Sequence, residues 1–224
     1  MGKFSLMIAH EVKNPLSIIK SSLDILKKDS ALSQSATMVQ YMEDEIGRLN
    51  SLIEDFLSFA HPMRPSFRHV DVNTLLRQIV MGFEIQKAES PVEVHSHIPS
   101  APCHAFVDPD LINRAISNIV KNAFEANGDK GAVTITVTCQ KDIWCVDIQD
   151  QGSGIDKKDM DKIFEPFFTT RSKGTGLGLA YAFQVIKIHN GAINATNSQE
   201  GGALFRVEIP VKREEGAVLK DRPA

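Results

Sequence analysis

A short segment near the start of the chain carries a histidine, an acidic residue and an amide at fixed spacing: His10, Glu11 and Asn14. A neutral imidazole has an ordinary pKa of about 6.5, so at pH 7 it is largely an unprotonated nucleophile. Glu11 can take the proton of the other ring nitrogen as a general base. A zinc-protease helix needs His-Glu-x-x-His, and Asn14 stands where the second histidine would be. An ordinary surface histidine is the alternative interpretation.

More than a hundred residues further on, asparagine, aspartate and glycine recur in patterns that suit a nucleotide. Asn118 and Asn122 lie one turn apart on an expected helix, and amide oxygens suit Mg²⁺, a hard cation that prefers oxygen ligands. Asp150 can accept a hydrogen bond from the exocyclic amine of adenine, where guanine carries a carbonyl. Gly152 and Gly154 let a ligand approach the backbone. Each pattern, taken alone, also fits a solvated helix face or a turn.

A third pattern, Gly174-Thr175-Gly176-Leu177-Gly178, opens another expected helix. Glycines and the free N–H groups of a helix N-terminus bind phosphate. The pattern is not a Walker loop, because no Gly-Lys-Ser/Thr follows, and not a Rossmann fingerprint, because no strand ends directly before it. The preceding loop mixes phenylalanines with Arg171 and Lys173, which is typical of a lid over a triphosphate. An ordinary loop anchored by its phenylalanines is the alternative.

Residues 4–61 are predicted to form a helical hairpin, because apolar residues recur at spacings of three and four. The stripe of the first arm comprises Phe4, Ile8, Val12, Leu16, Ile19, Leu23 and Leu26. The coiled-coil-like seam of the second arm comprises Val39, Met42, Ile46, Leu49, Ile53, Phe56 and Ala60. The polar stretch 27–36 is the expected turn. Two helices cannot cover both stripes, so we predict a homodimer whose hairpins form a four-helix bundle.

Two prolines, Pro62 and Pro65, end the hairpin, and a mixed α/β region is predicted to follow. The fold class expected is therefore α followed by α/β, with a mixed sheet that carries helices on one face. Predicted helices span 72–89, 108–126 and 177–189, and predicted strands span 68–71, 92–97, 105–107, 133–138, 143–148, 192–196 and 203–209. The expected domains are a hairpin at 1–62, a linker at 63–67, an α/β domain at 68–212 and a loose tail at 213–224.

Net charge, hydropathy and cysteine content limit the classes of function that this chain can have. A net charge of -3 over 224 residues gives no sign of nucleic-acid binding. The sequence has no apolar run of the roughly 18–20 residues that a membrane span needs. Three cysteines at Cys103, Cys139 and Cys145 lack metal-type spacing, which argues for a reducing compartment and against a disulfide framework. Since Phe4 lies almost inside a helix, we expect a cytoplasmic fragment whose upstream sensor or membrane region is missing.

These motifs, in this order, resemble the histidine, asparagine, glycine and phenylalanine boxes of the sensor histidine kinases of two-component signalling. The resemblance covers nearly the whole chain, and the run 122–126 is similar to the nitrogen-regulatory subgroup. It implies a dimerisation and histidine-phosphotransfer hairpin followed by a Bergerat-type ATP-binding domain. Gyrase, a chaperone family and the MutL repair ATPases share that nucleotide fold, which is called the GHKL type.

The resemblance implies an ATP-dependent protein histidine kinase. His10 would take the γ-phosphoryl group and pass it to an aspartate of a response-regulator receiver domain, with Glu11 as base and Asn14 orienting a water that dephosphorylates the partner. Asn122 would be the Mg²⁺ ligand, with Asn118 assisting, and Asp150 would bind adenine. The other implied ATP-binding residues are Gly152, Gly154, Arg171, Lys173, Gly174, Thr175, Gly176, Leu177 and Gly178.

Two positions depart from the family pattern. Ala203 stands where the family usually has a threonine, so one polar contact toward the base is expected to be missing. Gln151 replaces the more usual asparagine after the adenine-binding Asp150. A GHKL-type ATPase clamp without phosphohistidine is the alternative function, but such clamps place a glutamate at the position of Asn118, and an amide cannot serve as that base. A non-catalytic dimerisation module with a degenerate pocket is a third hypothesis, which fails because every box is intact apart from Ala203.

Overall fold

The structure is a computed structural model that describes residues 12, 15–23, 25–26, 32–60, 63–86, 92–128, 130–140, 142–171, 174–199 and 201–211. The chain divides into two compact units. A helical unit comprises residues 1–62 together with 166–177, and a sheet-containing unit comprises residues 63–165 and 178–224. Nothing in the described helices is both long and apolar enough to cross a membrane.

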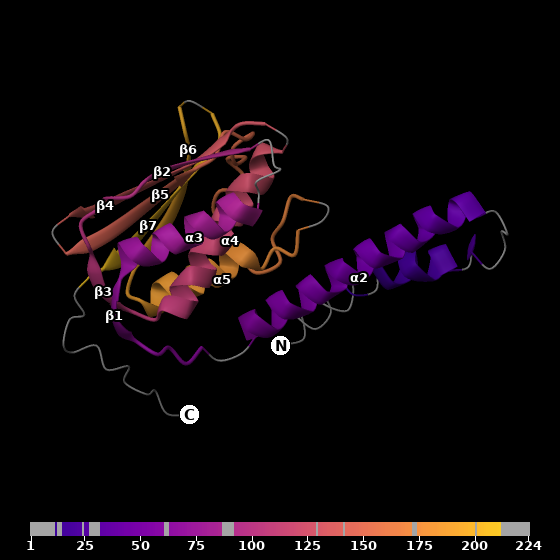
Figure 1. Cartoon of the computed structure of the whole chain (residues 1–224), viewed down its shortest axis with the longest axis horizontal. Helices are drawn as coiled ribbons and strands as arrows, with labels where there is room; N and C mark the ends of the chain where they lie inside the picture. Colours follow the sequence, from indigo (N-terminus) through magenta and orange to yellow (C-terminus); the bar gives the residue numbers. More distant parts are fainter. Residues whose placement is uncertain are drawn as a thin grey trace. The chain divides into compact units, whose positions relative to one another are not determined.

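The helical unit contains α2 (Leu32–Ala60) and a helical stretch at residues 15–23 and 25–26. Figure 1 shows this indigo stretch running beside α2. The predicted turn through residue 36 is too long, because α2 already begins at Leu32. Its first turns are serine- and glutamine-rich but contain neither glycine nor proline, and only those two residue types strongly oppose a helix.

The apolar seam predicted on α2 is only partly covered within one chain. Val39, Ile46 and Ile53, spaced by seven residues, remain 43%, 49% and 45% exposed. Leu52, which is not part of the predicted seam, is instead buried at 4% exposure. The helical unit therefore presents a row of large aliphatic side chains that nothing in the described chain covers.

The sheet-containing unit is built on a mixed five-stranded sheet with the order β2-β4-β5-β7-β6. β2 (Glu93–His97) is parallel to β4 (Ala132–Gln140), and the remaining neighbours, β5 (Ile143–Gln149), β7 (Ala203–Pro210) and β6 (Ala192–Asn197), pair antiparallel. The predicted strands are all present, with ends within two residues of those expected. β1 (Arg68–Asp71) and β3 (His104–Val107) form a separate antiparallel pair.

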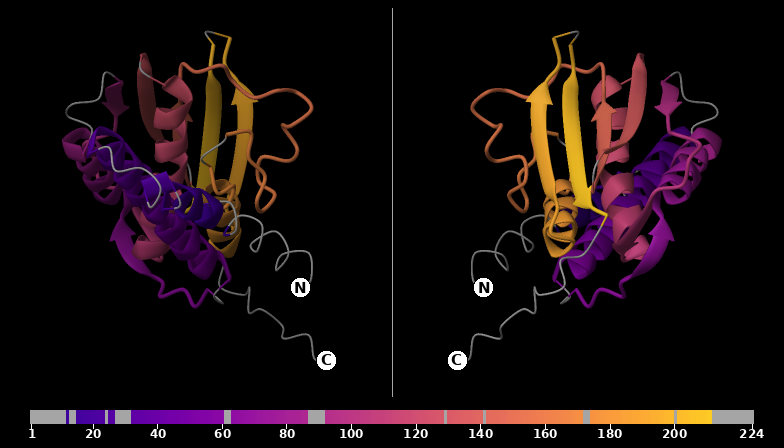
Figure 2. Two further views of the ribbon diagram at one scale, coloured as in Figure 1. Left: turned by 90° about the vertical axis from the view of Figure 1, so that its right-hand side faces the viewer. Right: turned by 90° about the vertical axis from the view of Figure 1, so that its left-hand side faces the viewer.

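Three helices cover one face of this sheet (Figure 2): α3 (Val72–Gln86), α4 (Pro109–Asn127) and α5 (Gly178–Ile188). Alternate strand residues point into the helical layer and are fully buried, as the period-two pattern requires. They include Val133, Ile135, Trp144, Val146, Ile148, Phe205, Val207 and Ile209. The indole N–H of Trp144 donates to Asn73 Oδ1 at 3.1 Å, which satisfies the one polar atom of that side chain.

A disulfide joins Cys103, just before β3, to Cys139 near the end of β4, with their Cα atoms 6.8 Å apart. The sequence-based argument against disulfides is therefore wrong for this pair. The two residues are 36 positions apart, and only the folded arrangement of the small strand pair beside β4 brings them together. Cys145 remains free, and its thiol is half-buried.

Candidate functional site

Helix α4 begins at the predicted residue for a clear local reason. Asp108 has the extended backbone of an N-cap (φ -88°), and its Oδ1 accepts hydrogen bonds from the N–H groups of Asp110 and Leu111 at 3.0 Å. Pro109 occupies the first turn, where its missing N–H costs nothing. One face of α4 is buried against the sheet, while Asn118 and Asn122 lie half-buried on another face.

The start of α4 is fixed by a buried histidine that the sequence did not single out. The backbone N–H of Asp108 donates to His189 Nε2 at 3.0 Å, and the Nδ1–H of His189 donates to the carbonyl of Val185 at 2.7 Å. Since Nε2 must accept, the imidazole is neutral with its proton on Nδ1. Burial lowers the pKa of His189. The ring also contacts Phe67 of the linker, with centroids 5.0 Å apart.

The N-terminus of α5 lies against the amide-bearing face of α4. A Cβ added at Gly178, the first residue of α5, would lie 3.6 Å from Cγ of Asn118. The free N–H groups at this end of α5 can bind an anion, and the amide oxygens of Asn118 and Asn122 can bind a hard cation. The donors and acceptors present therefore fit a phosphate group with its Mg²⁺.

Asp150 stands near the C-terminal end of α4, directly after β5. It is 1% exposed, and its Oδ1 accepts from the N–H groups of Gly152 and Ala203 at 2.9 and 3.0 Å. The Asp150 N–H in turn donates to the Ala203 carbonyl at 3.0 Å. Because both side-chain hydrogen bonds end on Oδ1, Oδ2 is the oxygen that can accept a hydrogen bond from a ligand.

Ala203, the departure from the family pattern, still contacts Asp150 through its backbone. Ala203 is 4% exposed, and its backbone N–H, rather than a hydroxyl, holds Asp150. Gly202 makes this approach possible, since its φ is +77° and an added Cβ would lie 2.0 Å from the Asp150 carbonyl oxygen. Gly202 therefore supports the position of Asp150 as directly as Gly152 does.

The loop after Asp150 is anchored by a side chain from another strand. Asn197, the last residue of β6, accepts from the Ile155 N–H at 2.7 Å and donates to the Ile155 carbonyl at 2.8 Å. A Cβ at Gly154, which has φ +75°, would lie 2.8 Å from Asn197 Oδ1. Sequence reasoning missed Asn197, because a single asparagine at a strand end carries no recognisable pattern.

The glycine-rich segment 174–177 belongs to the helical unit by its contacts. The Phe167 N–H donates to the Gly176 carbonyl at 2.9 Å, and a Cβ at Gly176 (φ +65°) would lie 2.5 Å from the Phe167 carbonyl carbon. The Thr175 hydroxyl donates to Asp55 Oδ2 of α2 at 2.8 Å. The Arg171 N–H donates to Thr169 Oγ1 at 3.1 Å, which shapes the turn.

Several predicted site residues lie outside the described part of the chain: His10, Glu11, Asn14 and Lys173. The described residues contain no group of three or more His, Cys, Asp or Glu side chains that could hold a metal. His95 instead pairs with Glu93 at 3.1 Å on exposed β2.

The chemistry-bearing residues of the sheet-containing unit thus line one helix. From Asn118 to Ala126, which contacts the loop at Gly152, the axial distance is about 12 Å at ~1.5 Å per residue. A cation and anion site at one end and a buried carboxylate at the other suit an elongated ligand. Adenine at one end and phosphates at the other form such a ligand.

Comparison with known proteins agrees with this arrangement. Residues 107–213 match the family described as "Histidine kinase-, DNA gyrase B-, and HSP90-like ATPase". Residues 1–63 match the family described as "His Kinase A (phospho-acceptor) domain". Among solved structures, the catalytic domain of histidine kinase ThkA is 31% identical and has a TM-score of 0.61; the match covers 65% of this chain and 96% of that one.

Curated relatives are similar over nearly all of this chain. AtoS of Escherichia coli K12, a signal transduction histidine-protein kinase, is 29% identical over 94% of the chain, and the sensor histidine kinase ZraS of Salmonella typhi is 31% identical over 94%. The chain spans only 35% and 46% of the length of these relatives. Both domain matches and these relatives point to one family, and the chain therefore belongs to the sensor histidine kinases.

Proposed function

We propose that this chain is the catalytic core of a protein histidine kinase that binds ATP along α4 and phosphorylates His10. The observation that carries the proposal is the pairing of the buried Asp150 carboxylate near the C-terminal end of α4 with Asn118, which lies at the middle of α4 beside the N-terminus of α5. The family match over residues 1–63 supplies the phospho-acceptor segment. The proposed domain bounds are 1–62, 63–67, 68–212 and 213–224.

Selectivity for adenine follows from the hydrogen bonds that the protein makes to one oxygen of the Asp150 carboxylate. Oδ1 of Asp150 is held by two backbone N–H groups, so Oδ2 accepts a hydrogen bond from the exocyclic amine of adenine. Guanine presents a carbonyl there and is repelled. The carboxylate cannot turn away from the ligand without breaking both bonds to Oδ1, so the selectivity is built into the fold rather than into a mobile side chain.

At the phosphate end, α5 begins at Gly178 and directs free N–H groups toward the ligand. Asn122, with Asn118 assisting, holds Mg²⁺, which supplies charge neutralisation on the transferring phosphoryl group. Arg171, Lys173 and the backbone of 174–178 complete the phosphate contacts. Phosphoryl transfer of this kind depends mainly on positioning and electrostatics.

The unprotonated imidazole of His10 attacks the γ-phosphorus in line, and Glu11 takes the proton of the other ring nitrogen. The bond from the γ-phosphorus to the bridging oxygen breaks, and ADP leaves. The phosphoryl group then passes to an aspartate of a response-regulator receiver domain. Support comes from the ThkA structure in complex with the response regulator TrrA, whose kinase is 27% identical over 94% of this chain with a TM-score of 0.81. Asn14 orients a water that attacks the phosphoaspartate of the receiver, so that the phosphorus–oxygen bond to the aspartate breaks and inorganic phosphate leaves.

The exposed aliphatic row on α2 supports a homodimer. Val39, Ile46 and Ile53 repeat every seven residues and remain more than 40% exposed in the single chain. A second hairpin would cover this row and form a four-helix bundle. We further propose a cytoplasmic location, where Cys103 and Cys139 would be reduced to thiols, as part of a longer sensor of the nitrogen-regulatory subgroup.

The proposal is tested by nucleotide binding to Asp150→Asn, with Asp161→Asn as an exposed control of the same domain. The variant amide places a donor where Oδ2 was, so ATP affinity should fall on the order of 10- to 100-fold while GTP affinity does not fall. The control should bind as the native chain does. Equal binding of ATP and GTP by the native chain would overturn the assignment of Asp150.

Magnesium dependence tests the other end of the site. Asn122→Ala should weaken ATP binding in the presence of Mg²⁺ and leave binding in excess chelator unchanged. Slow ATP hydrolysis by the native chain with no phosphorylated protein would instead support the ATPase clamp.

A further inference from the structure

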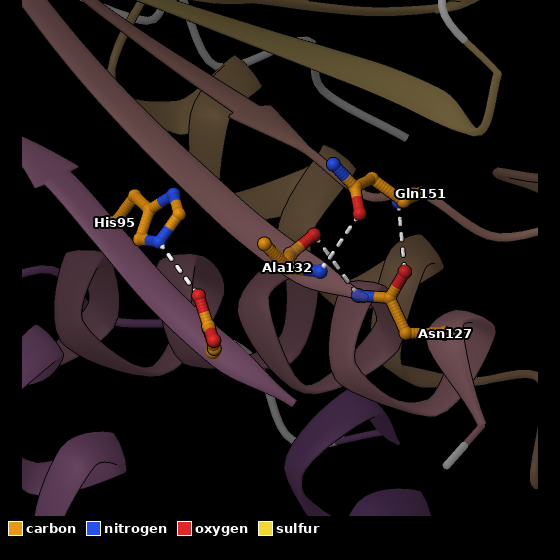
Figure 3. Close-up of polar contacts among 5 residues, drawn as sticks. His95, Asn127, Ala132 and Gln151 are labelled. Carbon is orange, nitrogen blue, oxygen red and sulfur yellow. Dashed lines mark hydrogen bonds and ion pairs between the residues drawn. The ribbon is translucent and has the colours of Figure 1, made fainter. Parts of the chain in front are cut away.

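Three backbone segments meet at a network of two side-chain amides beyond the end of α4 (Figure 3). Asn127, the last residue of α4, accepts a hydrogen bond from the Gln151 N–H at 2.7 Å through its Oδ1. Its Nδ2 donates to the Ala132 carbonyl at 3.2 Å. The Ala132 N–H donates to Gln151 Oε1 at 3.1 Å. The two amides therefore hold both polar groups of one residue of β4 and the peptide that follows Asp150.

Gly131 shows how closely these segments approach. It has φ +104°, and an added Cβ would lie 3.2 Å from both Asn127 Oδ1 and Gln151 Oε1. A side chain at this position would press on both amides and adopt a strained backbone. The Gly131 carbonyl also accepts from the Glu93 N–H at 3.0 Å, which ties the start of β2 to the same point.

The loop that follows Asp150 packs against the last turn of α4 at the neighbouring residue. A Cβ added at Gly152 would lie 2.5 Å from the Ala126 carbonyl oxygen, and the Gly152 N–H donates to Asp150 Oδ1. The path from Asn127 through Gln151 and Gly152 to the carboxylate thus contains only backbone and two hydrogen bonds. A shift of the Gln151 peptide would move one of the two donors that orient Asp150.

We infer that Asn127 and Gln151 are positioning residues for adenine recognition: their amides clamp the end of α4, the start of β4 and the loop after Asp150 so that the Asp150 carboxylate keeps its orientation before the nucleotide binds. This inference rests on the proposed role of Asp150. Neither residue needs to touch the nucleotide, and both act through the backbone that holds the carboxylate.

The length of the residue-151 side chain matters to this inference. The Oε1 of Gln151 reaches the Ala132 N–H at 3.1 Å. An asparagine here would be shorter by one methylene and would not reach that N–H from the same backbone position. The network between Asn127, Ala132 and Gln151 is therefore complete only with a side chain of the length of glutamine at residue 151.

The test measures the dissociation constant of ADP with Mg²⁺ by calorimetry on the full chain, together with thermal stability. Asn127→Ala loses two hydrogen bonds and should weaken ADP binding about tenfold, and Gln151→Ala loses one and should weaken it about fivefold. The loss of ADP affinity in the double variant should be smaller than the product of the two single losses, because both side chains hold the same residue, Ala132. Asn194→Ala and Gln78→Ala, exposed amides of the same domain, should bind ADP as the native chain does.

Conservative variants separate positioning from a loss of stability. Gln151→Glu keeps an acceptor oxygen at the same distance and should restore binding to within about twofold, whereas Gln151→Asn should behave like Gln151→Ala. For self-phosphorylation the KM of ATP should rise by the same factors as the dissociation constant. The rate at saturating ATP should change by less than about twofold, because the phosphate end is not altered.

Unchanged ADP affinity in both Asn127→Ala and Gln151→Ala, with only a lower Tm, would overturn the inference and leave a structural role. If in that case Asp150→Ala still abolishes ADP binding, the proposed function stands and only the positioning role of Asn127 and Gln151 fails. If the native chain does not bind ADP, or Asp150→Ala binds it normally, the proposed function fails and the inference falls with it.

Discussion

The adjacent glycines Gly201 and Gly202 allow the support of Asp150 to be tested with a matched pair of variants. Both have positive φ, +96° and +77°, so alanine carries a similar backbone penalty at either position, about 1 kcal/mol. Their surroundings differ completely. A Cβ at Gly201 meets nothing within 4 Å, whereas a Cβ at Gly202 would lie 2.0 Å from the Asp150 carbonyl oxygen and 2.8 Å from its Oδ1.

In Gly202→Ala the Asp150 backbone must move by about 1 Å or more to restore an ordinary contact. This movement breaks or weakens the hydrogen bonds that join Asp150 to Ala203 and Gly152. Three hydrogen bonds at about 1 kcal/mol each, added to the backbone penalty, predict a destabilisation of about 4 kcal/mol, against about 1 kcal/mol for Gly201→Ala. A domain of ordinary stability, about 5–15 kcal/mol, would remain folded.

Urea denaturation gives the free energy of unfolding of both variants, and calorimetry gives their ADP affinity at low denaturant. Gly201→Ala should bind ADP like the native chain, and Gly202→Ala should lose more than about tenfold in affinity, because the carboxylate is displaced. If the two variants lose stability and affinity equally, the close approach of residue 202 to Asp150 does not support the site and the reasoning is refuted.

Other features of the fold lead to further predictions. The neutral, buried His189 has a lowered pKa, so below about pH 6.5 the unfolded chain binds a proton at this residue more readily than the folded chain does. The free energy of unfolding should therefore fall between pH 7 and 5.5 more steeply in the native chain than in His189→Gln, with a difference in slope of at most about 1.4 kcal/mol per pH unit. Equal slopes in the two proteins would contradict this. The disulfide joins residues that are 36 positions apart, so Cys139→Ser should lower the free energy of unfolding by about 4 kcal/mol. The stability of this variant should no longer depend on added reductant. An unchanged urea midpoint would show that the bond contributes nothing to stability. Ile46→Glu places a charge in the exposed row on α2 and should convert a dimer into a monomer in sedimentation equilibrium, whereas Glu43→Gln, at an exposed polar position of the same helix, should not; a native chain that is already monomeric at micromolar concentration would exclude the dimer.

The order and type of the secondary-structure elements could be predicted because local signals agreed with the fold. Asp108 followed by Pro109 marked the start of α4, and the alternating residues of β4 and β5 marked two half-buried strands. The start of α2 was missed because serine and glutamine suit a turn and a helix almost equally. Sheet order was not predicted, since the parallel pairing of β2 with β4 bypasses β3 and α4.

The motif residues of the nucleotide site could also be predicted, but the residues that hold them could not. Asp150 stands out by its flanking glycines, whereas Asn197, His189 and Asn127 are single polar residues whose partners lie 42, 81 and 24 positions away. Cys103 and Cys139 pair for the same reason, through the fold and not through spacing. Such long-range contacts become visible only when the strands and helices are placed.

The central claim is that the imidazole of His10 receives the γ-phosphoryl group of ATP. Incubation of the native chain and His10→Gln with γ-labelled ATP and Mg²⁺, followed by acid and alkali treatment of the protein, tests it directly. The account predicts label on the native chain that is stable to alkali and lost in acid, and none on His10→Gln. Label that persists in His10→Gln, or a native chain that binds ATP and never becomes labelled, would contradict it.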